Sequence, residues 1–164
     1  MSLDLYDTDV PKDCPLGAQQ IMRVLPHRYP FLLIDKIVER EDLQMARGIK
    51  QLTLNEDFFR GHFPDDPQMP FSLVIEAMAQ VGAVSVLAHP TYRGRYILFA
   101  SLDNADFGRI PVPGDCLEIR SEFLNFRRGM GRTRIVCKIE DELVVEADFC
   151  FAVADMSTTA APAE

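Results

Sequence analysis

"FSLVIEAMAQVGAVSVLA", residues 71–88, is apolar on nearly every side. Such a segment predicts one long helix that is buried all round, and at ~1.5 Å per residue it would run about 27 Å. A sheet that curls around the helix would bury it on every side. The stretch therefore favours a central helix held inside a curved sheet. Its few exceptions are Ser72, Glu76, Gln80, Gly82 and Ser85.

Composition and charge exclude several classes of protein. A membrane span requires ~20 mainly apolar residues and disfavours charge at its centre, whereas this segment carries a glutamate and an amide near its middle. The chain of 164 residues has a formal net charge of -8, and nucleic-acid binders need a basic face. The acidic start "MSLDLYDTDV" does not resemble a signal peptide. We expect a cytoplasmic protein with no membrane insertion and no nucleic-acid partner.

Strand patterns lie on both sides of the predicted helix. Residues 31–42 and 43–54 are two runs rich in strand formers, divided by charged residues, and they predict a hairpin. Later, residues 116–123 and 134–140 alternate apolar and polar positions on either side of a glycine-containing turn, and residues 143–155 form a longer alternating run. About four strands are expected after the helix. Without a βαβ rhythm, this order favours an α+β fold with an antiparallel sheet.

The length fits one domain, which we place over residues 17–155. A short helix begins it and is stopped by Pro26. Residues 1–16 are predicted to be a flexible N-terminus, and the small, polar residues 156–164 a disordered tail. The four cysteines are far apart, with no Cys/His cluster at zinc spacing, so no metal site is expected.

The glutamate inside the apolar helix is the first candidate for chemistry. Ser72, Glu76 and Gln80 are spaced four residues apart and form one narrow polar stripe. Burial would raise the pKa of a glutamate from ~4.3 towards a value useful for a general acid. A structural pairing of Glu76 with an arginine is an equally good interpretation of its position alone.

A histidine precedes the helix in a proline-rich loop. His62 lies between Gly61 and Phe63, and the prolines that follow restrict the backbone around it. Histidine exchanges protons near pH 7, although a lone histidine usually has a structural role. The start of the helix adds unpaired N–H groups that would stabilise a developing oxyanion. Base, acid and oxyanion site together suit proton abstraction α to a carbonyl with departure of a β-hydroxyl.

Five motifs, in order and spacing, resemble the β-hydroxyacyl-acyl carrier protein dehydratases of type II fatty acid synthesis, the FabZ type. The resemblance covers residues 18–155. The motifs are "LPHRYPFLLID", "GHFPDDPQMP", "EAMAQ", "PVPGDCLEI" and "FRRGMGR".

The resemblance implies a hot-dog fold, in which a curved antiparallel sheet wraps a long central helix. It implies a homodimer whose sheets join, with trimers of dimers as a larger assembly. It also implies that His62 is the general base and Glu76 the acid, contributed by different subunits, in a hydro-lyase that converts (3R)-hydroxyacyl thioesters to trans-2-enoyl thioesters. No cofactor is implied, because the phosphopantetheine arm of the acyl carrier protein presents the substrate. Glu76, with no tryptophan in the chain, favours a dehydratase without isomerase activity.

Further residues are expected to serve substrate and partner. Arg127, Arg128 and Arg132 at a predicted hairpin tip are candidates for docking an acidic carrier protein. His27 is interpreted as a residue that positions the chain before the first strand. The residues expected to contact the substrate are Phe63, Pro70, Phe71, Ser72 and Gln80.

The resemblance also implies a substrate tunnel at the interface of the dimer. Phe71 stands where the resembled family usually has glycine, and we expect its ring to enter this tunnel and restrict the acyl chain. Asp65 likewise replaces a usual glycine, and aspartate tolerates a left-handed backbone. Two alternatives remain open at this point: a hot-dog acyl thioesterase and a non-catalytic acyl-thioester binder.

Overall fold

The computed structural model describes Val10, Pro11 and residues 13–155. The predicted disordered tail over 156–164 lies outside the described residues, as do residues 1–9 and 12 of the predicted flexible N-terminus. Val10 is buried, and Leu16 pairs with the second strand. The packed structure therefore extends beyond the expected boundary at residue 17.

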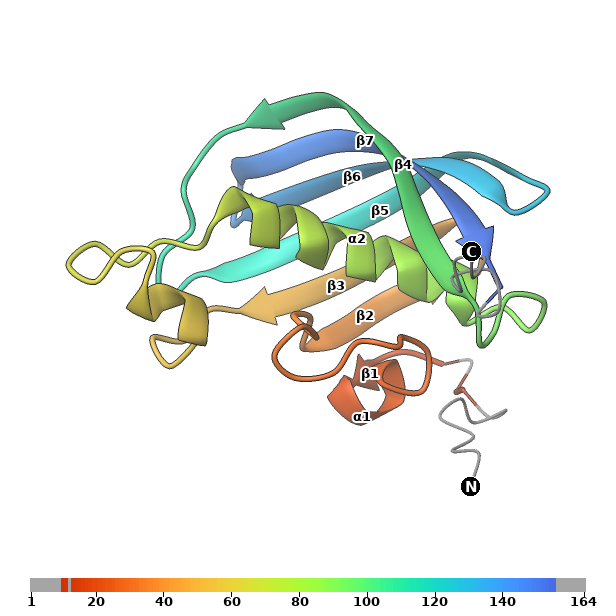
Figure 1. The fold of residues 1–164 in the computed structure, drawn as a ribbon, viewed down its shortest axis with the longest axis horizontal. Helices are drawn as coiled ribbons and strands as arrows, with labels where there is room; N and C mark the ends of the chain where they lie inside the picture. The colour runs from red at the N-terminus through yellow and green to blue at the C-terminus, as the bar shows by residue number, and fades with distance from the viewer. Residues whose placement is uncertain (1–9, 12, 156–164) are drawn as a thin grey trace, which may run out of the picture.

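Seven strands and one long helix make up the domain (Figure 1). In chain order they are β1 (Leu16–Gly17), α1 (Ala18–Ile21), β2 (Lys36–Glu41), β3 (Met45–Gln51), the 3-10 turn η1 (Asp57–Arg60), α2 (Phe71–Leu87), β4 (Tyr96–Phe107), β5 (Cys116–Arg127), β6 (Met130–Ile139) and β7 (Glu142–Ala154). The predicted order of two strands, a long helix and four more strands is confirmed. The short β1 was not predicted.

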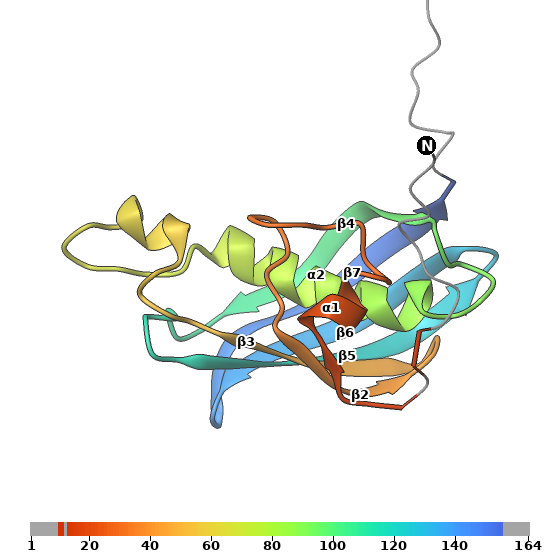
Figure 2. The same ribbon diagram turned by 90° about the horizontal axis from the view of Figure 1, so that it is seen from below.

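All seven strands belong to one antiparallel sheet, in the order β1-β2-β3-β5-β6-β7-β4. The sheet curls, and α2 lies in its hollow (Figures 1 and 2). β5 and β6 form the predicted hairpin. β4 pairs only with β7, so it is one edge of the sheet. The arrangement is the α+β hot-dog fold expected from the sequence.

Close approach of helix and sheet depends on two glycines. A Cβ on Gly48 of β3 would lie 2.5 Å from Val81 Cγ2, and one on Gly82 of α2 would lie 3.1 Å from Ser121 Oγ of β5. Every residue of α2 from Ala77 to Leu87 is buried. The prediction of a helix buried all round is confirmed from that point onward, while its first turns are more exposed. No helix in the described part of the chain is long and apolar enough to cross a membrane.

The first predicted strand begins later than its sequence suggested. Residues 31–35 are apolar like a strand, but β2 starts at Lys36. Leu33 and Ile34 are nevertheless buried, and the Gln80 side chain of α2 bonds to the backbone of this segment. Burial explains the apolar run, and the side-chain hydrogen bonds replace those of a sheet.

One carboxylate is buried within the sheet near its free edge. Asp148 of β7 accepts hydrogen bonds from Arg134 Nε (2.9 Å), Arg132 Nη2 (3.0 Å) and Asn104 Nδ2 (2.9 Å). These bonds, first of all that from Arg134, hold the pKa of Asp148 well below its ordinary value. The network connects β4, β6 and β7 through one side chain.

Asp148→Asn is expected to lower the free energy of unfolding at pH 7 by about 1 kcal/mol, a small effect because its arginine partners are partly exposed. A carboxylate with a lowered pKa stabilises the fold above its unfolded pKa of ~3.9, and this contribution is lost as the pH falls. The difference from wild type should therefore shrink below about pH 4. Urea unfolding at pH 7 and pH 3 measures it, with the more exposed Asp103→Asn as control. A pH-independent difference would contradict the ionic origin.

Candidate active site

Glu76, in the second turn of α2, has one carboxylate oxygen engaged and one open. Its Oε1 accepts a hydrogen bond from Gln80 Nε2 at 2.7 Å and lies 3.4 Å from His27 Nε2. No described residue donates to Oε2, and about a third of the side chain is exposed. A proton carried by Glu76 would therefore reside on Oε2, which remains available to a ligand.

Gln80 fixes the orientation of this carboxylate. It is buried, and its Nε2 donates both to Glu76 and to the carbonyl of Phe31, while its Oε1 accepts the N–H of Leu33. Its amide is thus occupied within the chain. Its bonds hold Glu76 and the segment before β2 in place, and the expected contact of Gln80 with substrate stays a prediction.

His27 is a neighbour of Glu76 that sequence reasoning missed. We had interpreted it only as a residue that positions the chain before the first strand. It comes from a loop 49 residues away from Glu76, and its Nδ1 is buried with no hydrogen-bond partner among the described residues. The one available signal was its place inside the "LPHRYPFLLID" motif. The spacing of residues along the sequence does not indicate that this loop lies beside Glu76 in α2.

An apolar cavity of about 320 Å³ opens beside Glu76. It runs along α2 towards Leu87, and its other wall is β4. Its lining is hydrophobic apart from the polar end formed by His27, Glu76 and Gln80. This is the form expected of a site that holds an acyl chain with a reacting polar group at one end. The β4 residues in its wall are Tyr96, Ile97 and Phe99.

His62 lies in the loop that leads into α2, and its ring orientation is fixed. Nδ1 is 3.0 Å from the carbonyl oxygen of Gln68, and the ring stacks on Phe63 at 4.2 Å. A carbonyl oxygen can only accept, so Nδ1 carries the proton. In the neutral ring Nε2 then has a free lone pair, as a general base requires.

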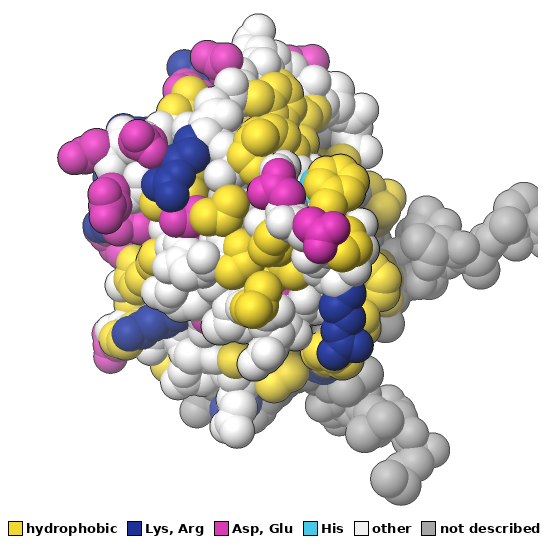
Figure 3. Space-filling model, turned by 90° about the vertical axis from the view of Figure 1, so that its left-hand side faces the viewer, with side chains coloured by type: hydrophobic (Ala, Val, Ile, Leu, Met, Phe, Trp, Pro, Cys, Tyr) yellow, Lys and Arg dark blue, Asp and Glu magenta, His cyan; other side chains and the backbone are white. Residues whose placement is uncertain are grey.

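No hydrogen bond or ion pair among the described residues joins His62 to Glu76, and the two share no bonding partner. The loop that contains His62 extends beyond the start of α2 (Figure 1). Glu76 lines the cavity whose other wall is β4. Hydrophobic side chains are exposed over much of the molecule at the loop end (Figure 3). Phe63 and Leu54 are among the exposed hydrophobic residues near His62 in the sequence.

The start of α2 offers two backbone donors. Pro70 is its N-cap, and the Pro70 carbonyl accepts from Leu73 and Val74. No described residue accepts a hydrogen bond from the N–H of Phe71 or Ser72. These donors carry the positive end of the helix dipole, so they suit a developing negative charge.

The Phe71 ring lies away from the Glu76 cavity. It contacts Phe107 at the end of β4 in an edge-to-face arrangement, with ring centroids 5.1 Å apart, and packs against the core. Phe71 does not line that cavity. We had expected this ring to enter the tunnel; its contact with Phe107 in the single chain favours a packing role.

Phe71→Gly is expected to cost about 2 kcal/mol of folding stability, since a half-buried aromatic ring is removed. The range of accepted acyl chains should stay unchanged. Thermal unfolding and a chain-length profile of both proteins measure the two effects, and Phe71→Leu, which keeps most of the bulk, should retain more stability. A broadened profile would mean that the ring restricts the tunnel.

The three arginines of the β5–β6 hairpin differ in their surroundings. Arg127 and Arg128 are exposed and make no ion pair with a described residue. Arg132 is bound to Asp148 at 3.0 Å and lies 3.9 Å from Asp103. All three side chains line a hollow of about 520 Å³. Arg127 and Arg128 are therefore better candidates than Arg132 for binding an acidic partner.

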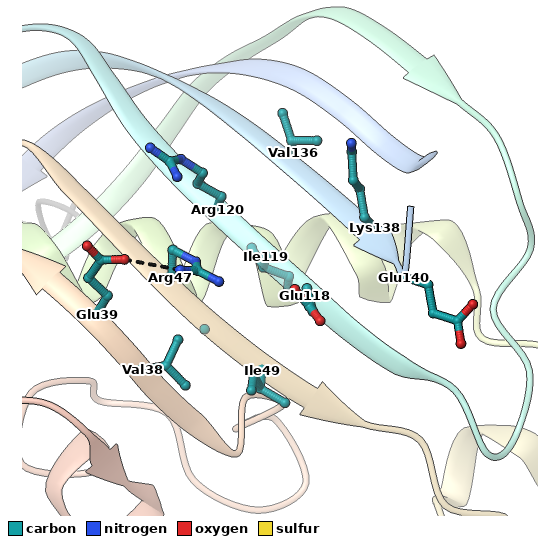
Figure 4. A pocket seen from close by; sticks show the side chains of 11 residues that line it. Val38, Glu39, Arg47, Ile49, Glu118, Ile119, Arg120, Val136, Lys138 and Glu140 are labelled. Atoms are coloured by element: carbon teal, nitrogen blue, oxygen red, sulfur yellow. Dashed lines mark hydrogen bonds and ion pairs between the residues drawn. The ribbon is translucent and has the colours of Figure 1, made fainter. Parts of the chain in front are cut away.

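A hollow of about 820 Å³ lies on the outer face of the sheet (Figure 4). Its wall carries charges of both signs, including Glu39 and Arg47, which form an ion pair at 3.2 Å. Neither His62 nor Glu76 lines it, so it is separate from the acid–base residues. No group of His, Cys, Asp or Glu side chains in the described chain could hold a metal ion.

These features define a hot-dog-fold protein with a candidate acid, Glu76, at the polar end of an apolar cavity. Among solved structures, the dehydratase heterocomplex ApeI:P from Xenorhabdus doucetiae matches with a TM-score of 0.69 at 17% identity, over 84% of this chain and 92% of that one. This likeness supports the fold.

Sequence comparison identifies the family. Residues 25–148 match the model of the FabA-like domain. The 3-hydroxyacyl-[acyl-carrier-protein] dehydratase FabZ of Desulforamulus reducens is 51% identical over 84% of this chain and 97% of its own length. The FabZ of Bacillus licheniformis is 46% identical, over 85% and 97%. The chain belongs to the FabA-like family and is of the FabZ type.

Proposed function

We propose that the protein is a 3-hydroxyacyl-[acyl carrier protein] dehydratase of fatty acid biosynthesis. As a hydro-lyase it removes water from (3R)-hydroxyacyl thioesters and gives trans-2-enoyl thioesters. The observation that carries the proposal is the open Oε2 of Glu76 at the polar end of an apolar cavity. The names of the FabZ relatives support the same reaction.

His62 begins the reaction as the base. Its free Nε2 removes the proton α to the thioester carbonyl, while the Nδ1–H bond to Gln68 keeps the ring oriented. Negative charge then develops on the thioester oxygen. The unpaired N–H groups at the start of α2 stabilise that charge.

Glu76 completes the elimination as the acid. Oε2 gives its proton to the departing 3-hydroxyl, and water leaves as the C–O bond breaks. Gln80 and His27 on Oε1 hold the carboxyl group while this happens. Hydration of the enoyl thioester follows the same path in reverse, with Glu76 as base.

A second copy of the chain completes the site in this proposal. The free edge strand β4 exposes Leu98, Phe99, Leu102 and Phe107, and unpaired edges favour strand addition. The same strand forms one wall of the Glu76 cavity. A copy joined at β4 would cover this cavity and could bring its own histidine loop to it. The assembly is thus a homodimer with sheets joined, and trimers of dimers are the larger form that the family resemblance suggests.

The acyl carrier protein is the proposed partner that delivers substrate. The phosphopantetheine arm belongs to that substrate, and the reaction as written needs no cofactor. A cytoplasmic location remains a prediction from the sequence. Arg127 and Arg128 lie at the end of the molecule opposite to the His62 loop of their own chain (Figure 1). A carrier docked there would approach a site shared by two copies.

The reaction is tested by incubating the protein with 3-hydroxyacyl and enoyl thioesters of several lengths and following their masses. Loss or gain of water is the expected result. Release of free acid would indicate the thioesterase, and tight binding without any mass change would indicate a non-catalytic binder. Either of these results would overturn the proposal.

Arg127→Glu/Arg128→Glu is expected to lower kcat/KM for carrier-linked substrate about tenfold and to weaken its dependence on salt, because an acidic carrier loses two opposite charges. Turnover of a small soluble thioester should not change. Kinetics at two ionic strengths measure both effects. Equal losses on the two substrates would indicate a role of the hairpin in folding instead of docking.

A further inference from the structure

A buried lysine lies outside the site described so far. Lys50, near the end of β3, is buried. Its Nζ pairs with Glu56 Oε1 and lies 3.7 Å from Asp35 Oδ2. A lysine is rarely buried without a partner, and breaking such a pair leaves an uncompensated charge. These contacts therefore hold the neighbouring chain to β3.

The lysine acts on the segment that carries His62. Glu56 is the N-cap of η1, and its carbonyl accepts the N–H of Phe59 at 3.1 Å. The carbonyl of Phe58, within the same turn, accepts the N–H of His62 at 3.1 Å. One short turn thus connects the Lys50 ion pair to the backbone of the histidine.

Few other contacts fix this turn. Phe59 is buried in the core, but the residues from Thr53 to Asn55 that connect β3 to the turn are exposed. Tyr29 donates to Asp57 at 2.5 Å, in an exposed position where water competes for the bond. Besides the core contacts of Phe58 and Phe59, the Lys50–Glu56 pair is the more shielded anchor of η1.

We propose that Lys50 is a positioning residue for dehydration: its ion pair with Glu56 sets the place of η1 and thereby of His62 Nε2. This rests on the proposed function, in which His62 is the base. Displacement of a reacting group by ~1 Å can cost about 100-fold in rate. Loss of the pair should therefore lower kcat more than it changes substrate binding.

The test compares Lys50→Met, Glu56→Gln and the double variant. Lys50→Met leaves Glu56 without its cation, and Glu56→Gln leaves Lys50 with only the longer contact to Asp35, so both lower kcat and Tm. The double variant removes both charges and should recover most of the Tm, yet its kcat should stay about 10–100-fold below wild type, with KM within about threefold. Lys50→Arg keeps the cation and should stay close to wild type, as should Lys138→Met, which removes an exposed lysine.

Nuclear magnetic resonance of the histidine rings gives a readout that does not require activity. The signals of His62 should shift in Lys50→Met and in the double variant, while those of His89 stay in place. Recovery of both kcat and Tm in the double variant, or an unmoved His62 signal, would overturn the proposal. A wild type that neither dehydrates nor hydrates thioesters would instead overturn the proposed function.

Discussion

His62→Ala is expected to lower kcat for dehydration about 10²–10⁴-fold, the usual contribution of a general base. The structure offers no substitute at that position, since Nε2 of His62 is the one open imidazole nitrogen in the loop before α2. Hydration of the enoyl thioester should fall equally, because the same proton is returned in that direction. Initial rates in both directions measure the effect.

His89→Ala is the matched control for this variant. His89 follows α2, and its Nδ1 accepts the N–H of Thr91 at 3.3 Å, far along the helix from the cavity end formed by Glu76. Its activity should equal that of wild type. Circular dichroism should show both variants folded. Near-full activity of folded His62→Ala would mean that another group removes the proton.

The central helix was predictable because its signal is local. Residues 71–88 contain too few polar residues for a surface helix, and the helix observed is Phe71–Leu87. The β5–β6 hairpin likewise follows from alternation on both sides of a glycine-containing turn. Residues 31–35 were misread as part of a strand because burial in a loop and burial in a sheet select the same side chains.

The residues of the candidate site were predicted from the sequence, but its geometry was not. His62 and Glu76 were proposed from residue type and motif, yet which of their atoms stay open depends on Gln68 and Gln80. The contact of His27 with Glu76 joins segments 49 residues apart, and no spacing rule encodes it. The packing of the Phe71 ring against Phe107 also depends on tertiary structure, so local sequence patterns did not predict it.

The proposed dimer joined at the free edge of β4 would bring the two proposed catalytic residues together. Glu76 lines the cavity whose other wall is β4, whereas the loop before α2 that contains His62 extends beyond the start of the helix (Figures 1 and 2). Two copies joined at β4 would give two equivalent sites. Each would take its base from one chain and its acid from the other.

Mixed dimers of one His62→Ala chain and one Glu76→Ala chain are therefore expected to regain about half of the wild-type activity, at least 100-fold above either variant alone, given that each lost group costs about 10²–10⁴ in rate. In such a dimer one site lacks both groups and the other keeps both. Two different affinity tags allow the heterodimer to be isolated, and its initial rate is compared with those of the two homodimers. The control is a mixture of the two variant homodimers under conditions in which they do not exchange subunits. If both groups of a site came from one chain, every site would lack one of them. Verified heterodimers would then stay inactive, and the shared site would have to be abandoned.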